Sequence, residues 1–399
     1  MSWEKVRLGD VTDSCLGKML DQEKNKGDYH PYLANVNVRW GSFDLENLPQ
    51  MRFEDDEQER YGLKYGDLII CEGGEPGRCA IWKDAIPNMK IQKALHRVRV
   101  HDCLDYRYLF YWFLWAGKRG ALEQYFTGAT IKHMPGQKLK SVIIDKPPIE
   151  TQRRIADILS AYDDLIENNR KQIKLLEEVA QRLYKEWFVD LRFPGHERTK
   201  IVDGVPEGWE SCILDDVIEF DPKVRLDKDR IKQFVPMSAL STASMVLDMN
   251  EISETTSNSG SKFQNGDTLL ARITPCLENG KTAFVHGLET DEGAVGSTEY
   301  IVMRSKKLNP YMVYLLSRTN SFRQSAINSM SGSDGRQRVK ADKLKALAYL
   351  LPPARLVHRF EKIVSPMFEM VFALNQQIFT ATQARDRLLP KLMSGEVEV

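Results

Sequence analysis

The chain has 399 residues, of which 42% are hydrophobic, and its 56 lysines and arginines are balanced by 56 aspartates and glutamates. This length is typical of two or three domains with cores of their own. The zero net charge argues against a histone-like or polybasic nucleic-acid binder, although it is compatible with local basic patches.

The second half of the chain repeats the first. Lys138-Leu139-Lys140 followed by Pro147-Pro148 recurs 205 residues later as Lys343-Leu344-Lys345 followed by Pro352-Pro353. A period of this length is a whole domain plus a long helix, and it is too long for a solenoid unit. The sequence therefore predicts a pseudo-two-fold molecule, and DNA is the commonest partner with a matching approximate symmetry.

The repeat predicts the order of the segments. They are a globular domain at 1–150, a long helix at 151–190, a linker at 191–208, a second globular domain at 209–350 and a C-terminal helix at 351–399. Matching turn-then-strand pairs at 65–70 and 265–270, with matching helices at 106–116 and 311–317, indicate α+β domains.

Each helical segment carries an apolar stripe at spacings of three and four residues. The first stripe comprises Ile155, Ile158, Tyr162, Leu165, Asn169, Ile173, Leu176, Ala180, Leu183 and Trp187. The second comprises Phe360, Val364, Met367, Val371, Leu374, Ile378, Ala381, Arg385, Leu388 and Leu392. Such stripes are typical of a coiled-coil seam, so we expect the helices to pair as an antiparallel coiled coil about 50 Å long.

Two details refine the helix prediction. Asn169 lies in the first seam and Asn375 close to the second, and a polar residue in a seam usually fixes its register. Pro366 predicts that the second helix begins there or is kinked. The alternative is two unrelated amphipathic helices, each lying on its own globular core.

Motifs for catalysis are absent from the sequence. Gly17-Lys18-Met19 and Gly280-Lys281-Thr282 are the nearest approaches to a P-loop, and neither completes one. The sequence also contains no glycine-rich methyltransferase turn, serine nucleophile elbow or zincin helix. We therefore expect no catalytic residues and no cofactor in this chain.

Two small, polar, basic loops occupy the same place in the repeat. They are Thr127–His133 and Ser331–Arg338, and each leads into a run of lysines. Hydroxyl groups, backbone N–H groups and basic side chains are what contact with DNA phosphates requires. As lone loops both would more often be solvated turns, but their equivalence favours DNA contact.

A second pair of loops holds candidate readers of base edges. Glu72–Arg78 is rich in glycine and presents Arg78, and its counterpart is Arg272–Lys281. Arg, Asn and Gln read bases through paired hydrogen bonds. The full candidate set for DNA contact is Lys18, Asn35, Asn37, Arg39, Trp40, Arg78, Gln92, Lys93, His96, Thr130, Lys132, His133, Arg225, Arg272, Thr274, Asn279, Lys281, Ser333, Arg336 and Arg338. Because the halves differ most in these loops, we expect two different half-sites.

The cysteines and the short length of the apolar stretches predict a cytoplasmic protein. The six cysteines contain no C-x-x-C pair, so we expect neither a disulfide framework nor a metal site. The most apolar early stretch, at 108–116, has only nine residues and is too short to span a bilayer.

The pattern resembles a known family, the specificity (S) subunits of Type I restriction-modification systems. The resemblance covers essentially the whole chain. It is carried by the segments 147–156, 163–169, 175–178 and 186–188, which are similar to the family's central conserved region, and by the loops 71–78 and 127–133. The C-terminal copy departs from this pattern, because Ala354-Arg355-Leu356 replaces the Glu-Thr-Gln stretch of the first copy.

The resemblance implies that each globular region is a target recognition domain that reads one part of a split DNA site. It also implies that the paired helices set the gap between the parts and bind two modification (methyltransferase) subunits, which motor-nuclease (restriction) subunits then join. Methyl donor, ATP and Mg²⁺ would belong to those partners. A coiled-coil assembly scaffold without DNA contact and an enzyme with an unrecognised site are the alternatives.

Overall fold

The structure, a computed structural model, describes residues 3–19, 21, 25–227, 230–289, 293–333 and 335–399. The chain divides into two compact units, one made of Met1–Asp164 with Thr382–Val399 and the other of Leu165–Ala381. Two long helices, α4 (Ile149–Tyr184) and α9 (Ala354–Ser394), each contribute residues to both units. The predicted domain boundaries stay predictions.

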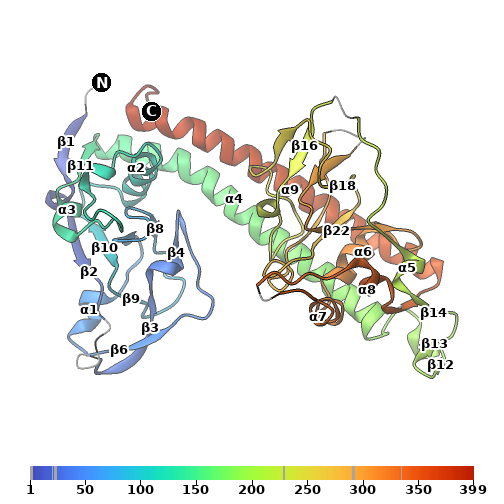
Figure 1. The fold of residues 1–399 in the computed structure, drawn as a ribbon. Coiled ribbons are helices and arrows are strands. Elements are labelled where there is room, and N and C mark those ends of the chain that lie inside the picture. The colour runs from blue at the N-terminus through green and yellow to red at the C-terminus, as the bar shows by residue number, and fades with distance from the viewer. Residues whose placement is uncertain (1–2, 20, 22–24, 228–229, 290–292, 334) are drawn as a thin grey trace. The chain divides into compact units, whose positions relative to one another are not determined.

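The first unit is built around a four-stranded antiparallel sheet in the order β2-β10-β7-β8 (Figure 1). Its strands are β2 (Thr12–Leu16), β7 (Leu68–Cys71), β8 (Cys79–Ile81) and β10 (Leu95–Val100). Strand β7 is a continuous apolar run whose four residues are all buried, as expected for a central strand covered on both faces. Helix α2 (Tyr106–Lys118) packs against this sheet with its buried aromatic side chains.

Smaller elements complete the first unit. They are β1 (Glu4–Arg7), β3 (Asp28–Leu33), β4 (Val38–Arg39), β5 (Ser42–Phe43), β6 (Gln50–Phe53), α1 (Glu57–Tyr61), β9 (Lys90–Ile91), α3 (Gly136–Lys140) and β11 (Ile143–Lys146). A three-stranded sheet has the order β6-β3-β9, and β1 pairs with β11.

The second unit repeats this architecture. Its four-stranded antiparallel sheet has the order β15-β22-β19-β20, with β15 (Ile218–Phe220), β19 (Thr268–Ala271), β20 (Thr282–Phe284) and β22 (Tyr300–Ser305). A second sheet has the order β17-β16-β21-β18, and β14 pairs with β23 as β1 pairs with β11.

The other elements of the second unit are β12 (Ile201–Val202), β13 (Val205–Pro206), β14 (Glu210–Ile213), α5 (Leu214–Val217), β16 (Lys232–Val235), β17 (Ser253–Thr255), β18 (Ser261–Phe263), β21 (Ala294–Gly296), α6 (Pro310–Ser317), α7 (Asn320–Asn328), α8 (Ala341–Lys345) and β23 (Ala348–Leu351).

The repeat extends to the turns that begin the central strands. Gly66 and Gly266 have φ angles of 87° and 89°, a left-handed conformation that glycine adopts without strain. The next residue in each turn, Asp67 or Asp267, is 1% exposed. The predicted α+β class and the internal repeat are confirmed.

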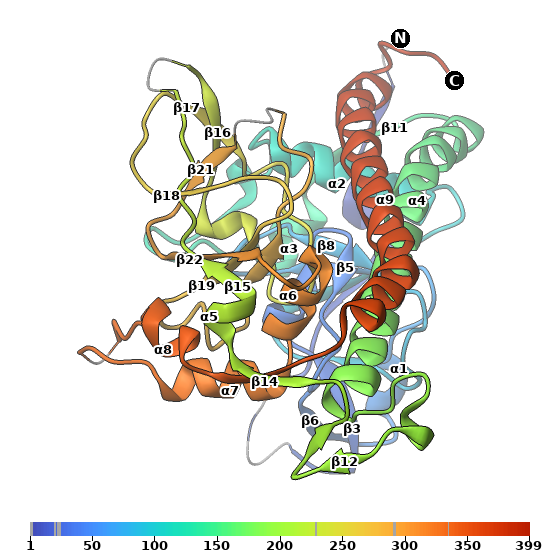
Figure 2. The same cartoon turned by 90° about the vertical axis from the view of Figure 1, so that its right-hand side faces the viewer.

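In the second unit α4 and α9 lie side by side and run antiparallel (Figures 1 and 2). Buried Asn169 of α4 donates a hydrogen bond from Nδ2 to Oε1 of Gln377 at 3.0 Å. Towards the other end of α4, the Tyr184 ring lies 6.0 Å from the ring of Phe360, near the start of α9. The predicted antiparallel pairing of the helices is confirmed.

In the first unit the remaining parts of α4 and α9 are joined by charged and polar contacts. Asp163 of α4 pairs with Arg385 of α9 and also accepts a hydrogen bond from the Tyr111 hydroxyl at 2.6 Å. Lys118 of α2 donates to Asp386 of α9 at 2.7 Å. Helix α2 is therefore tied to both long helices.

Two details of the helix prediction are wrong. Leu165, assigned to the first seam, is 42% exposed, and the adjacent apolar residue Ile166 is buried in its place, because packing decides which of the two faces inward. Helix α9 starts at Ala354, directly after two prolines, and continues through Pro366, so the prediction that it begins at Pro366 is wrong, while the predicted kink stays a prediction. Asn169 bonds to Gln377, and Asn375, which the sequence places close to the second seam, is half-buried.

Glu177 of α4 anchors a loop of the second globular region. Its Oε1 accepts hydrogen bonds from the Ser244 hydroxyl at 2.6 Å and from the Met245 N–H at 2.9 Å. Burial raises the pKa of this carboxyl above its usual value, because the charged form loses hydration. The folded chain therefore holds its proton more tightly than the unfolded chain does.

We expect Glu177 to make unfolding pH-dependent. The raised pKa contributes stability that is fully present below the unfolded value and is lost as pH rises through the folded value. Glu177→Gln, which is always neutral, should gain stability relative to wild type as pH rises from 4 to 8. Denaturant unfolding across this range measures the difference. A constant difference for Glu177→Gln would contradict the prediction.

Candidate nucleic-acid interface

Arg78 joins two of the predicted DNA-contact segments in the first unit. Its guanidinium donates to Glu75 Oε2 at 3.1 Å and to Asn35 Oδ1 at 2.9 Å. Glu75 also accepts from Trp40 Nε1 at 2.7 Å, and Asn35 donates to the Gly73 carbonyl at 2.6 Å. The loop 72–78 and the segment 35–40 therefore form one polar network.

The loop 127–133 closes onto the same network. His133 forms isolated β-bridges with Thr127 and with Gly73, so the loop is a short hairpin lying along the loop 72–78. A Cβ atom at Gly73 would lie 2.8 Å from Nδ1 of His133, so a larger residue there would displace the His133 ring. At the exposed tip, Lys132 lies 3.7 Å from Glu123.

The second unit builds its corresponding loops in the same way. Arg338 forms isolated β-bridges with Ser331 and with Ile273, which join the loops 331–338 and 272–281. The Arg338 guanidinium donates to both carboxylate oxygens of Glu299, at 2.6 to 3.0 Å. These hydrogen bonds lower the pKa of the Glu299 carboxyl.

In each unit the two bridged loops have the same backbone arrangement, which we call the two-loop frame, but the side chains at equivalent places differ. His133 and Arg338 occupy the same bridge position, and in each unit the next backbone N–H donates to the facing loop. The acceptors are the carbonyls of Glu72 at 2.7 Å and of Arg272 at 2.9 Å. Equivalent places thus carry Glu and His in the first unit and two arginines in the second.

Three of the predicted contact residues are buried and bonded within the first unit. Lys18, 3% exposed, forms an ion pair with Glu57. Asn37 caps its own turn, and His96 is 1% exposed with its Nε2 3.0 Å from the Met134 carbonyl oxygen. Burial lowers the pKa of His96. We therefore leave these residues out of the proposed contact surface.

The other predicted residues retain access to solvent. The exposed ones are Arg39, Lys93, Thr130, Lys132, His133, Arg225, Asn279, Ser333 and Arg336. The half-buried ones are Asn35, Trp40, Arg78, Gln92, Arg272, Thr274, Lys281 and Arg338. Lys281 donates to the Met237 carbonyl at 2.8 Å, and Arg225 lies outside both loops, on the segment after β15. Asp334, in the predicted loop 331–338, lies outside the described residues.

Sequence reasoning missed the carboxylate partners of the arginines. Glu75 lies in the predicted loop 72–78, but no sequence pattern assigned it a role, and Glu299 lies in no recognisable motif. Only the fold brings Glu299, 39 residues before Arg338, against its guanidinium.

The described residues bring no three His, Cys, Asp or Glu side chains together in a group that could hold a metal ion. None of the helices within those ranges has both the length and the apolar character needed to cross a bilayer.

Comparison with known proteins gives consistent matches. A family model for the Type I restriction modification DNA specificity domain matches residues 1–178. A Type I restriction enzyme specificity subunit (MjaIX) of Methanocaldococcus jannaschii is 27% identical over 352 residues, covering 84% of this chain and 78% of the relative. The EcoEI specificity subunit of Escherichia coli is 32% identical over 199 residues, which cover 48% of this chain and 33% of the relative.

A solved structure shares the fold. The Type I restriction-modification system S subunit from M. genitalium superposes with a TM-score of 0.59 at 14% identity, and the match covers 98% of this chain and 96% of that one. At this identity the likeness concerns the fold alone.

Proposed function

Since this chain belongs to the family of Type I restriction-modification specificity subunits, we propose that it recognises a bipartite DNA sequence and has no catalytic activity of its own. Each globular region is a target recognition domain that reads one half-site. The paired helices dock two methyltransferase subunits, which restriction (motor-nuclease) subunits then join. Methylation and cleavage belong to those partners.

One observation carries the proposal: the same two-loop frame is built twice and holds different side chains each time. His133 and Glu72 in the first unit correspond to Arg338 and Arg272 in the second. A single binding function used twice would keep the same side chains. Equal frames with unequal side chains suit the reading of two different half-sites, because base identity is read by side-chain hydrogen bonds.

The proposed contact surface combines two kinds of residue. In the exposed loops, Thr130, Lys132, Ser333 and Arg336 suit phosphate oxygens, because they present hydroxyl groups and charges to solvent. Arg78 is held by Glu75 and Asn35 and suits a base edge, because its guanidinium can exchange these partners for the acceptors of guanine, to which an arginine donates two parallel hydrogen bonds.

Alanine variants of the loops test this division. In the purified chain with its methyltransferase partner, Lys132→Ala and Arg336→Ala should each reduce the slope of log K against log salt by about 0.9, which corresponds to one phosphate. Arg78→Ala should cost about 1–3 kcal/mol of binding to the recognised sequence and relax specificity at one base pair. Equilibrium binding at several salt concentrations measures both effects.

Lys5→Ala is the matched control, because Lys5 is an exposed lysine of β1 and belongs to none of these loops. It should leave DNA binding unchanged. The alternative function, a coiled-coil scaffold without DNA contact, expects no change for any of these variants. If all four bind DNA as wild type does, the proposed contact surface is wrong.

A further inference from the structure

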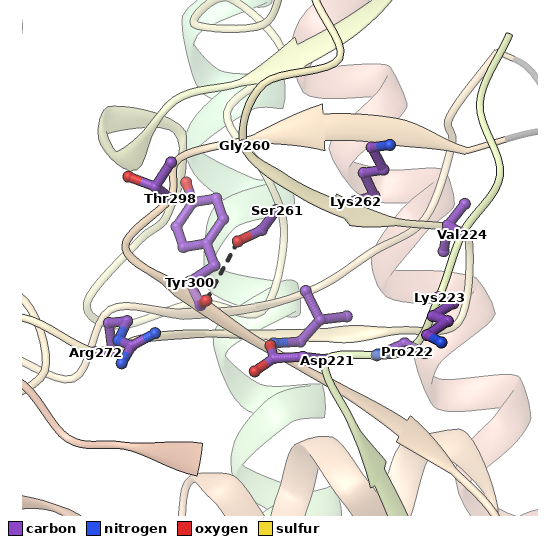
Figure 3. A pocket seen from close by; sticks show the side chains of 11 residues that line it. Asp221, Pro222, Lys223, Val224, Gly260, Ser261, Lys262, Arg272, Thr298 and Tyr300 are labelled. Carbon is purple, nitrogen blue, oxygen red and sulfur yellow. Dashed lines mark hydrogen bonds between the residues drawn. The ribbon is translucent and has the colours of Figure 1, made fainter.

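A polar pocket of about 350 Å³ opens in the second unit beside the loop frame. In the view of Figure 3, Arg272, Asp221 and Lys223 line its lower edge, and Thr298 and Lys262 line its upper edge. Tyr300 forms part of the wall; it is 1% exposed, and its hydroxyl lies 3.3 Å from the Val235 carbonyl oxygen. The pocket thus has a rigid wall and a charged rim.

The cations of this pocket lack the carboxylate partners found elsewhere in the loops. Arg78 and Arg338 each pair with a glutamate. Within the described ranges, by contrast, no carboxylate oxygen lies within 4.0 Å of a side-chain nitrogen of Lys223, Lys262 or Arg272. The Nε atom of Arg272 is buried and has no hydrogen-bond partner.

The nearby carboxylates do not cancel this charge. Among the lining residues that the structure describes, Asp221 is the one acidic residue, and its Oδ1 accepts the Val302 N–H at 3.0 Å. Glu299, between two lining residues in sequence, is held by both oxygens on Arg338, which faces it from the adjoining loop, and Arg272 contributes to the lowered pKa of its carboxyl, so Glu299 offsets part of the Arg272 charge. Among the described residues that line the pocket, three cations accompany one carboxylate, so this part of the lining is positively charged.

We propose that this pocket binds a phosphate group of a nucleotide, either within the DNA backbone or in a free mononucleotide. The inference rests on the proposed function, because it places the pocket beside a DNA-reading loop frame. Separate cations that can converge on one group suit a phosphate, whose oxygens spread negative charge over several directions. The Thr298 hydroxyl, exposed at the rim, adds a neutral donor.

The volume and the first unit support this assignment. A cavity of about 350 Å³ holds more than a bare phosphate, so the adjoining sugar can enter with it. Lys18, which follows β2 as Lys223 follows β15, is by contrast buried and paired with Glu57. The pocket therefore belongs to the second unit alone, where it adds a phosphate contact that does not depend on base identity.

The test uses the purified full chain with inorganic phosphate, thymidine monophosphate and two duplexes, one with the recognised sequence and one unrelated. The variant is Lys223→Gln with Lys262→Gln, at an exposed and a half-buried position. Lys307→Gln, an exposed lysine of the same unit outside the pocket, is the matched control. Binding of the small probes should weaken about tenfold or more in the double variant and stay unchanged in the control.

The duplexes distinguish the two sources. A backbone phosphate predicts that the double variant binds both duplexes more weakly, with a salt slope lower by about 0.9. A free nucleotide predicts loss of thymidine monophosphate binding with both duplexes unaffected. If neither the small probes nor the duplexes distinguish the double variant from Lys307→Gln, the pocket assignment is overturned.

This design separates failure of the inference from failure of the proposed function. Sequence-specific DNA binding that is equal in all variants, with no phosphate binding, overturns the pocket alone. A wild-type chain that binds phosphate through Lys223 and Lys262 but binds neither duplex overturns DNA recognition and leaves the pocket standing.

Discussion

Arg99→Ala is expected to lower the free energy of unfolding by about 3 kcal/mol, because it removes the counter-charge of a buried carboxylate. Asp67 is 1% exposed, and its carboxylate accepts two hydrogen bonds from the Arg99 guanidinium, from Nε at 2.8 Å and from Nη2 at 2.7 Å. The backbone N–H of Lys64 donates a third hydrogen bond to the same carboxylate at 2.7 Å. The lower end of the range for a broken buried pair applies, since the Arg99 side chain is 30% exposed.

The second unit repeats this arrangement, so it should repeat the effect. Asp267, also 1% exposed, accepts two bonds from Arg304 at 2.7 Å and one from the Gln264 N–H at 2.8 Å. Arg304→Ala is therefore expected to cost about the same 3 kcal/mol. Denaturant unfolding of the full chain measures both variants.

Two controls show whether burial causes the loss. Arg153→Ala breaks an exposed pair with Glu150, whose side chains are 53% and 74% exposed, and should cost less than about 1 kcal/mol. Asp67→Asn combined with Arg99→Met removes both charges and should recover most of the stability lost in Arg99→Ala. If Arg99→Ala lowers the free energy of unfolding no more than Arg153→Ala does, the buried ion pairs do not stabilise the two units.

A heptad inserted into both long helices is expected to lengthen the gap between the half-sites by about three base pairs, or to abolish binding. Seven residues add about 10 Å at 1.5 Å per residue, and base pairs are spaced about 3.4 Å apart. The insertions belong between Asn169 and Glu177 in α4 and between Val371 and Gln377 in α9. There they leave intact the bonds of Asn169 to Gln377 and of Glu177 to its loop.

The bases of each half-site should stay the same in this variant. The matched control places the same seven residues at the Asp203-Gly204 turn between β12 and β13, which should leave the gap unchanged. Sequencing of methylated sites measures gap and bases together. A change in the identity of either half-site would show that the helices do not act as a ruler.

Much of the fold could be predicted because the repeat appears in local signals. A glycine followed by aspartate marks the turn before each central strand, and Gly66 and Gly266 adopt the same conformation there. The apolar stripes of the two long helices likewise predict that these helices pair with each other. The spacing of apolar residues could not predict that Ile166 is buried and Leu165 exposed, because packing decides which of two adjacent apolar residues faces inward.

The candidate site was less predictable, because sequence shows charge but not burial or pairing. Lys18 is a cation like Lys132, yet the fold buries Lys18 against Glu57 and leaves Lys132 exposed. Lys262 was not singled out by any motif, and only the fold brings it to the same pocket as Arg272.

The central claim is that this chain alone decides which DNA sequence its partners modify. The most direct measurement is methylome sequencing of cells that carry the methyltransferase partner with and without this chain. We predict methylation at one bipartite sequence when the chain is present and no methylation at that sequence when it is absent. Unchanged methylation in cells lacking the chain would contradict the account.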